Sequence, residues 1–144
     1  MIMDIITNQI IVSVVFAMVV CNTWKTIDSS IRKKRHDLKA MFRTGGMPSA
    51  HASLVTALAV SIGLVEGFLS TVFLLTLGIA TIVIRDALGV RRHVDHLAKT
   101  VNEIIKVKKL TINGMLKITG HTPVQVVTGI LIGIIVPIVI NTFY

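Results

Sequence analysis

Several residue types are scarce in this chain of 144 residues, and each scarcity excludes a class of protein. The one cysteine, Cys21, excludes an internal disulfide, and its place in an apolar run predicts a small residue that faces lipid or the core. One Trp, one Tyr and five Phe are too few for a platform on which bases stack, so we expect no nucleic-acid partner. Acidic residues number 7 against 15 lysines and arginines, and the net charge of +8 favours an anionic membrane surface.

Charge is absent from four long stretches, although the chain as a whole is basic. Hydrophobic residues make up 53% of the sequence and the mean hydropathy is +0.79, which is too apolar for a soluble domain of this size. A spanning helix needs roughly 17–25 mostly apolar residues. We therefore predict an all-α fold, a polytopic membrane helix bundle that forms a single domain over residues 1–144. Its spanning helices, about four, are expected at 5–20, 53–65, 68–84 and 124–140.

The charged residues predict how the chain lies in the membrane. All 15 lysines and arginines fall in the segments 25–43 and 85–117, and the turn near residue 66 carries only Glu66. Because positive loops stay inside, we expect both segments on the cytoplasmic side of the plasma membrane and both termini outside. Asp4 stands where a signal peptide would be positive, so we expect the first apolar stretch to be retained.

Segment 94–110 has the pattern of an amphipathic helix on the cytoplasmic side. Its apolar residues Leu97, Val101, Ile104 and Ile105 share one helical face, and its lysines fall largely elsewhere. Such a helix either lies on the membrane surface or packs on the cytoplasmic face of the protein, and both interpretations stay open.

A Gly-x-x-x-Gly pair, Gly129 and Gly133, lies in the last apolar stretch. Small residues at this spacing let two helices approach closely, so we predict a packing face. A homo-oligomer that forms through this face is one alternative.

Two histidines occupy matching places, each just before a long apolar run. His51 ends the segment Arg43-Thr-Gly-Gly-Met-Pro-Ser-Ala-His51, and His121 lies in Gly120-His-Thr-Pro-Val-Gln125. The free N–H groups and the dipole of a helix N-terminus favour phosphate, and glycine lets the backbone approach a ligand. Each feature also has a structural interpretation: a histidine can cap or pack, and Thr122 and Gln125 have the spacing of a capping box.

Four pieces of the sequence together resemble one family. They are Gly45-Gly-Met-Pro-Ser-Ala-His51, Arg85-Asp-Ala-Leu-Gly-Val-Arg-Arg92, Val101-Asn-Glu-Ile104 and Gly120-His-Thr-Pro-Val-Gln125, in this order. The chain is thereby similar to the divergent branch of the type-2 phosphatidic acid phosphatase superfamily, which also includes vanadium haloperoxidases. The resemblance runs from the first basic segment into the last apolar stretch.

The resemblance implies a division of labour between the two histidines. His121 would attack phosphorus and form a phosphohistidine, and His51 would act as general acid on the leaving oxygen. The phosphate oxygens would be held by Ser49, Arg91, Arg92, Arg43 and the backbone at Gly46. The reaction would require no metal and no cofactor.

The chain also departs from the superfamily pattern. Gln125 stands where a carboxylate orients the nucleophilic histidine, and an amide can hold an imidazole but cannot stabilise an imidazolium as a charge does. Asp86 and Asp95 are the candidates for a supporting carboxylate. The superfamily's upstream Lys and Arg-Pro element has no clean match, and Met115 stands where an arginine would precede His121.

These observations favour a lipid phosphate phosphatase that faces the cytoplasm. Phosphatidylglycerophosphate is the favoured substrate, and phosphatidic acid and polyprenyl phosphate or diphosphate are alternatives. The competing hypothesis is a catalytically degenerate membrane protein that binds anionic lipid headgroups or a protein partner. A transporter or pore is disfavoured because no ionisable residue lies in the middle of a predicted span.

Overall fold

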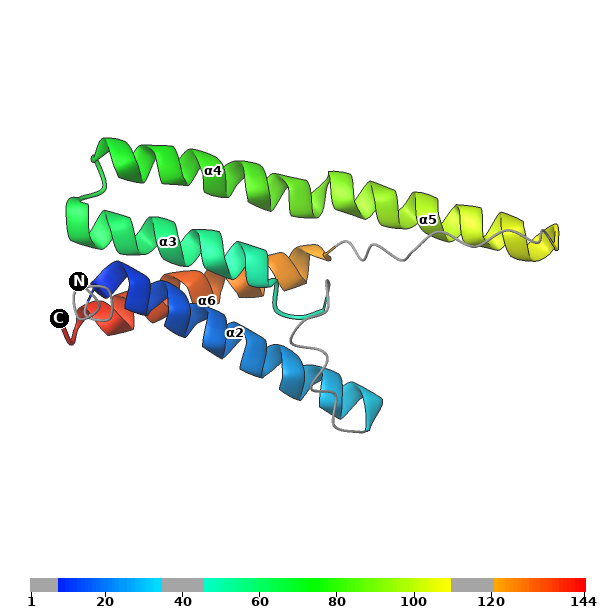
Figure 1. Cartoon of the computed structure of the whole chain (residues 1–144), viewed down its shortest axis with the longest axis horizontal. Helices are drawn as coiled ribbons and strands as arrows, with labels where there is room; N and C mark the ends of the chain where they lie inside the picture. Colours follow the sequence, from blue (N-terminus) through cyan, green and yellow to red (C-terminus); the bar gives the residue numbers. More distant parts are fainter. Residues whose placement is uncertain (1–7, 35–45, 110–120) are drawn as a thin grey trace.

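The computed structural model describes residues 8–34, 46–109 and 121–144, and in these ranges the chain is helical with no strand (Figure 1). The helices are α2 (Gln9–Lys33), α3 (Ala50–Glu66), α4 (Thr71–Leu88), α5 (Val90–Val107) and α6 (Pro123–Asn141). This confirms the predicted all-α membrane helix bundle.

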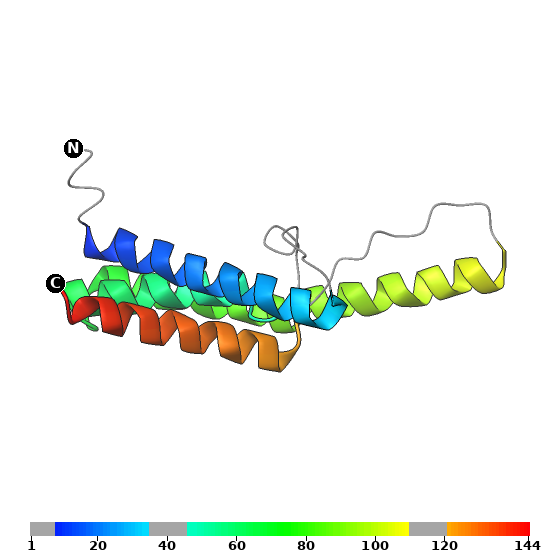
Figure 2. The ribbon, with the colours of Figure 1, turned by 90° about the horizontal axis from the view of Figure 1, so that it is seen from below.

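Helix α3 lies at the centre of the bundle and contacts α2, α4 and α6 (Figures 1 and 2). One end of the bundle holds the start of α2, the α3–α4 turn and the end of α6. The opposite end brings together the starts of α3 and α6 and the end of α4. Each segment that carries a predicted functional histidine therefore reaches this second end, from which α5 projects.

The centre of the bundle is built from small residues. In α3 the buried residues include Ala52, Ala57 and Ser61. Large apolar side chains of α4, such as Leu75 and Ile82, are exposed. This is the reverse of a soluble protein and suits a helix exterior that faces lipid.

The two glycines of α6 pack against α3 within the same chain. A Cβ atom at Gly133 would lie 2.7 Å from the carbonyl oxygen of Ser53, and one at Gly129 would overlap the carbonyl oxygen of Ser49. The prediction of a packing face is thus confirmed. Within the chain, α3 packs on this face, and the homo-oligomer through the same glycines stays a prediction.

In the described part of the chain, three helical runs are long and apolar enough to cross a membrane: Gln9–Ile31, Thr71–Val107 and Pro123–Asn141. The second of these runs contains α4 and continues into α5. The fourth predicted span, α3, is apolar but has only 17 residues. Its central position explains how a short helix is accommodated, because neighbouring helices surround it instead of lipid.

The first helix is longer than its apolar run predicted. It continues to Lys33 and ends at Lys34, whose left-handed backbone (φ 51) closes the helix. Lys25, Arg32 and Lys33 therefore belong to α2, which corrects their assignment to a loop. The apolar pattern stops near residue 20, but polar residues with helical backbones carry the helix onward.

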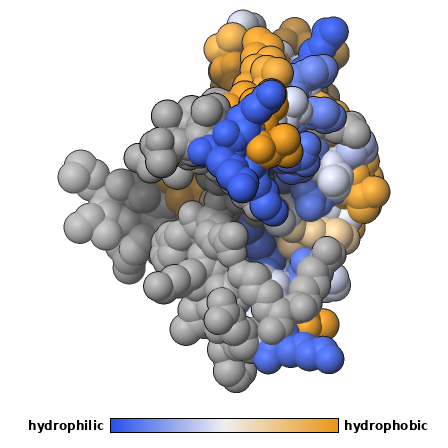
Figure 3. Space-filling model, turned by 90° about the vertical axis from the view of Figure 1, so that its right-hand side faces the viewer, coloured by the Kyte–Doolittle hydropathy of each residue, from blue (hydrophilic) through white to orange (hydrophobic). Residues whose placement is uncertain are grey.

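Helix α5 confirms a helix in the predicted amphipathic segment, and it begins earlier, at Val90. Within the described ranges it contacts α4 alone, and Leu97 and Ile104 on its apolar face are exposed. Figure 3 views the molecule from the end where α5 projects and shows hydrophilic residues gathered beside hydrophobic ones. Packing of α5 on the rest of the bundle is therefore not observed in the part of the chain that the structure describes.

Candidate phosphate-transfer site

His51 is held at the start of α3 by a short, well-bonded loop. Ser49 is the N-cap of α3, and its hydroxyl oxygen accepts a hydrogen bond from the backbone N–H of Ala52 at 3.4 Å. The backbone N–H of Ser49 donates to the carbonyl oxygen of Gln125 at 2.8 Å. This second bond joins the α3 entry to the first turn of α6, so the two histidine-bearing segments are fastened together.

His121 directly precedes α6, whose start is capped on both sides. Thr122 and Gln125 form the predicted capping box: Thr122 N–H donates to Gln125 Oε1 at 3.0 Å, and Gln125 N–H donates to Thr122 Oγ1 at 3.4 Å. Pro123 occupies the first turn of α6, whereas Pro48 lies before the cap of α3 and follows a cis peptide bond. The residue His121 is 4% exposed.

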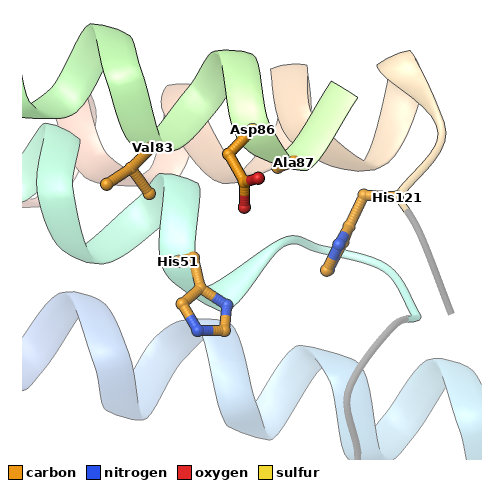
Figure 4. Close-up of a pocket in the computed structure, with 5 residues that line it drawn as sticks. All are labelled: His51, Val83, Asp86, Ala87 and His121. Atoms are coloured by element: carbon orange, nitrogen blue, oxygen red, sulfur yellow. The ribbon is translucent and has the colours of Figure 1, made fainter. Parts of the chain in front are cut away.

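A small hollow joins the two histidines. It is lined by His51, Val83, Asp86, Ala87 and His121, and measures about 210 Å³, including the part open to solvent. Figure 4 shows Asp86 pointing from α4 into the space between the two imidazole rings. His51 is exposed whereas His121 is buried, so one side of the hollow is open to solvent and the other is shielded from it.

Of the predicted supporting groups, Asp86 reaches this hollow and the others lie elsewhere. The Gln125 side chain accepts a hydrogen bond from the backbone N–H of Thr122, the cap residue of its own helix. The structure thus shows Gln125 as a member of the capping box. Asp95 lies on α5, where its carboxylate pairs with Lys99 at 2.7 Å. Neither residue lines the hollow.

The predicted phosphate-binding groups are distributed more widely. Ser49 is fully buried, caps α3 and is not among the residues that line the hollow. Gly46 is exposed in a left-handed conformation (φ 91) that favours glycine. Arg43 lies outside the described residues. Arg91 and Arg92 belong to the first turn of α5, where the structure describes their backbone only. Their roles stay predictions.

Lys25 is a residue that sequence reasoning placed among the loop cations and did not single out. Lys25 is 6% exposed, and its Cε atom lies 3.3 Å from where a Cβ of Gly46 would be. A buried lysine in an apolar helix is costly, so we treat Lys25 as a candidate functional residue. The sequence offered one signal for this: Lys25 follows the apolar stretch 5–20 closely, and a helix can continue past the end of such a stretch.

Within the described ranges, no group of three His, Cys, Asp or Glu side chains is arranged to hold a metal ion. The hollow is lined by two imidazoles and one carboxylate. Imidazole can act as a nucleophile, as an acid and as a base near neutral pH.

Comparison with known proteins identifies the family of the chain. A family model described as "Divergent PAP2 family" matches residues 6–136. The chain is 30% identical to a protein called "Uncharacterized membrane protein YuiD" from Bacillus subtilis (strain 168), over 99% of each chain. No solved structure matches the chain. The protein therefore belongs to the divergent PAP2 family, the branch of the type-2 phosphatidic acid phosphatase superfamily that its sequence motifs resemble.

Proposed function

We propose that this membrane protein is a phosphatase that removes phosphate from a membrane lipid through a phosphohistidine intermediate. The observation that supports the proposal is the convergence of His51 and His121, from the starts of two different helices, on one small hollow. Membership of the divergent PAP2 family supports the same class of chemistry.

In the proposed first step, a ring nitrogen of His121 attacks phosphorus while the bond from phosphorus to the lipid oxygen breaks. His51 gives a proton to that leaving oxygen, and the dephosphorylated lipid departs. In the second step His51 takes a proton from water, whose oxygen attacks the phosphohistidine and displaces the His121 nitrogen. Phosphate is released and both imidazoles return to their starting states.

The place of the hollow at one end of the bundle favours a lipid that offers only its headgroup. The acyl or prenyl chains would stay in the bilayer against the exposed apolar helix faces. We favour phosphatidylglycerophosphate, with phosphatidic acid and polyprenyl phosphate or diphosphate as alternatives.

The orientation is also part of the proposal. The lysines and arginines fall in segments 25–43 and 85–117. The described parts of these segments include the ends of α2 and α4, which lie at the histidine end of the bundle, and α5, which projects from it. The positive-inside rule then directs this end to the cytoplasm and both termini to the outside of the plasma membrane. Labelling of single cysteines introduced at Thr122 and Phe143 in intact cells and in inverted vesicles tests this orientation; reagent access to residue 122 from outside would contradict it.

A second function has one specific observation in its favour. Gln125 stands where the superfamily carries a carboxylate, and the structure commits its acceptor to the capping box. A member that has lost turnover could still bind anionic headgroups at the same hollow. This non-catalytic function predicts binding of lipid phosphate without release of inorganic phosphate.

Phosphate release by the purified protein in detergent separates the two functions. The substrates are phosphatidylglycerophosphate, phosphatidic acid, and a polyprenyl phosphate and diphosphate. We expect release from at least one, loss of release in His121→Ala, and full release in the matched control His96→Ala, whose histidine is exposed on α5. Absence of release by folded wild-type protein, with retained headgroup binding, would favour the non-catalytic function.

A further inference from the structure

Asp86 is the one carboxylate among the described residues that line the hollow. It comes from the last turn of α4, a helix that neither histidine belongs to, and it lies near Val83 and Ala87 on the same side of that helix. Figure 4 shows its carboxylate directed into the space between the two rings. A negative charge thus faces the proposed reaction centre from a third helix.

The buried histidine has the greater need for such a charge. When a neutral imidazole attacks phosphorus, the ring gains positive charge, and a charge away from water is costly unless a counter-charge is near. His121 is 4% exposed, so water cannot supply most of this stabilisation. His51 is exposed and can be hydrated throughout the reaction.

We propose that Asp86 is the positioning residue of the nucleophile His121, and the inference rests on the proposed phosphatase function. In this arrangement a ring N–H of His121 donates a hydrogen bond to the Asp86 carboxylate, which leaves the other ring nitrogen directed at phosphorus. The carboxylate also balances the positive charge of the phosphorylated ring. The chain thereby replaces the carboxylate that is missing at Gln125 with one that comes from α4.

A purely structural role for Asp86 is the competing explanation. Arg85 is its neighbour in sequence, and an ion pair that only fastens the end of α4 would also make the residue sensitive to substitution. The two roles differ in what they affect. A structural role changes folding, whereas a positioning role changes the turnover of folded protein and can be restored by a carboxylate from solution.

The test compares Asp86→Asn and Asp86→Ala with wild type on the lipid phosphate that wild type hydrolyses. Asp86→Asn keeps the shape of the side chain, and we expect kcat to fall about 100-fold or more with a change in KM of less than about threefold. Helical circular dichroism and the melting temperature in detergent should stay near wild type. Glu103→Gln, an exposed carboxylate on α5, is the matched control and should retain full turnover.

Chemical rescue provides the decisive readout. Formate is small enough to occupy the space that Asp86→Ala leaves, and we expect it to raise the turnover of that variant at least about fivefold. It should not raise the turnover of His121→Ala. Wild-type turnover in Asp86→Asn, or lost turnover accompanied by unfolding and no formate response, would overturn the role of Asp86 while leaving the phosphatase function intact. Absence of turnover in wild type would overturn both.

Discussion

The starts of α3 and α6 both deliver a histidine to the same hollow, yet they do so in different ways. His51 lies inside the first turn of α3, after the cap residue, and is exposed. His121 lies before the cap of α6 and is buried. His51 is open to water, while His121 is shielded from it. This difference fits the acid–base role that we propose for His51 and the nucleophilic role that we propose for His121.

The largest expected effect is the loss of the phosphoenzyme in His121→Ala. Rapid acid-free quenching of wild type with lipid labelled at its phosphate should trap a phosphoprotein that survives base and decays in acid. The His121→Ala variant has no ring nitrogen at this position, so neither the phosphoprotein nor turnover should be detected. A trapped phosphoryl group in this variant would show that another residue is the nucleophile.

His51→Ala should reveal the other half of the comparison. We expect turnover of the lipid substrate to fall roughly 100- to 10,000-fold, because both proton transfers lose their catalyst. With an aryl phosphate, whose leaving group needs no proton, the first step should be largely spared. The phosphoenzyme should then accumulate, since its hydrolysis still lacks a base. Equal losses on both substrates, with no accumulation, would contradict the assignment of His51 as general acid.

The packing between the starts of α3 and α6 can be weakened by a substitution that does not touch either histidine. Gly129→Ala adds a Cβ that overlaps the carbonyl oxygen of Ser49, so we expect destabilisation of about 1–3 kcal/mol and a lower melting temperature in detergent. Gly78→Ala makes the same change in α4 where no atom lies within 4 Å. The alanine there should be neutral or stabilising by up to about 1 kcal/mol, through helix propensity. Equal effects at both positions would argue against close α3–α6 packing.

Much of this arrangement could be predicted from the sequence because it follows from topology. Helices that cross a membrane in succession return their ends to the same side, so His51, Asp86 and His121 had to meet at one end. The small residues at Gly129 and Gly133 likewise indicated close packing, although not against which helix. Spacing and composition alone are sufficient for predictions of this kind.

The features of the site that could not be predicted from the sequence depend on where individual side chains point. Hydropathy marks where a helix leaves the apolar region but not where it ends, so the helical position and burial of Lys25 were missed. Asp86 and Asp95 are equally plausible carboxylates by sequence, and only the packing of α4 against the bundle distinguishes them. Gln125 has the spacing of both a capping residue and an orienting residue, and its hydrogen bond to Thr122 separates the two.

The smallest expected effect concerns this capping residue. Gln125→Ala removes the acceptor of the Thr122 N–H, so α6 should begin less firmly, and we expect a loss of about 1 kcal/mol in stability. Gln125→Glu keeps an acceptor at the same place and adds a negative charge at a helix N-terminus, which should preserve or slightly raise the melting temperature. Because residue 125 faces the cap, the new carboxylate should not increase turnover. An increase of tenfold or more would show that this side chain can leave the cap for His121, and that the α6 start controls the nucleophile more directly than its hydrogen bonds indicate.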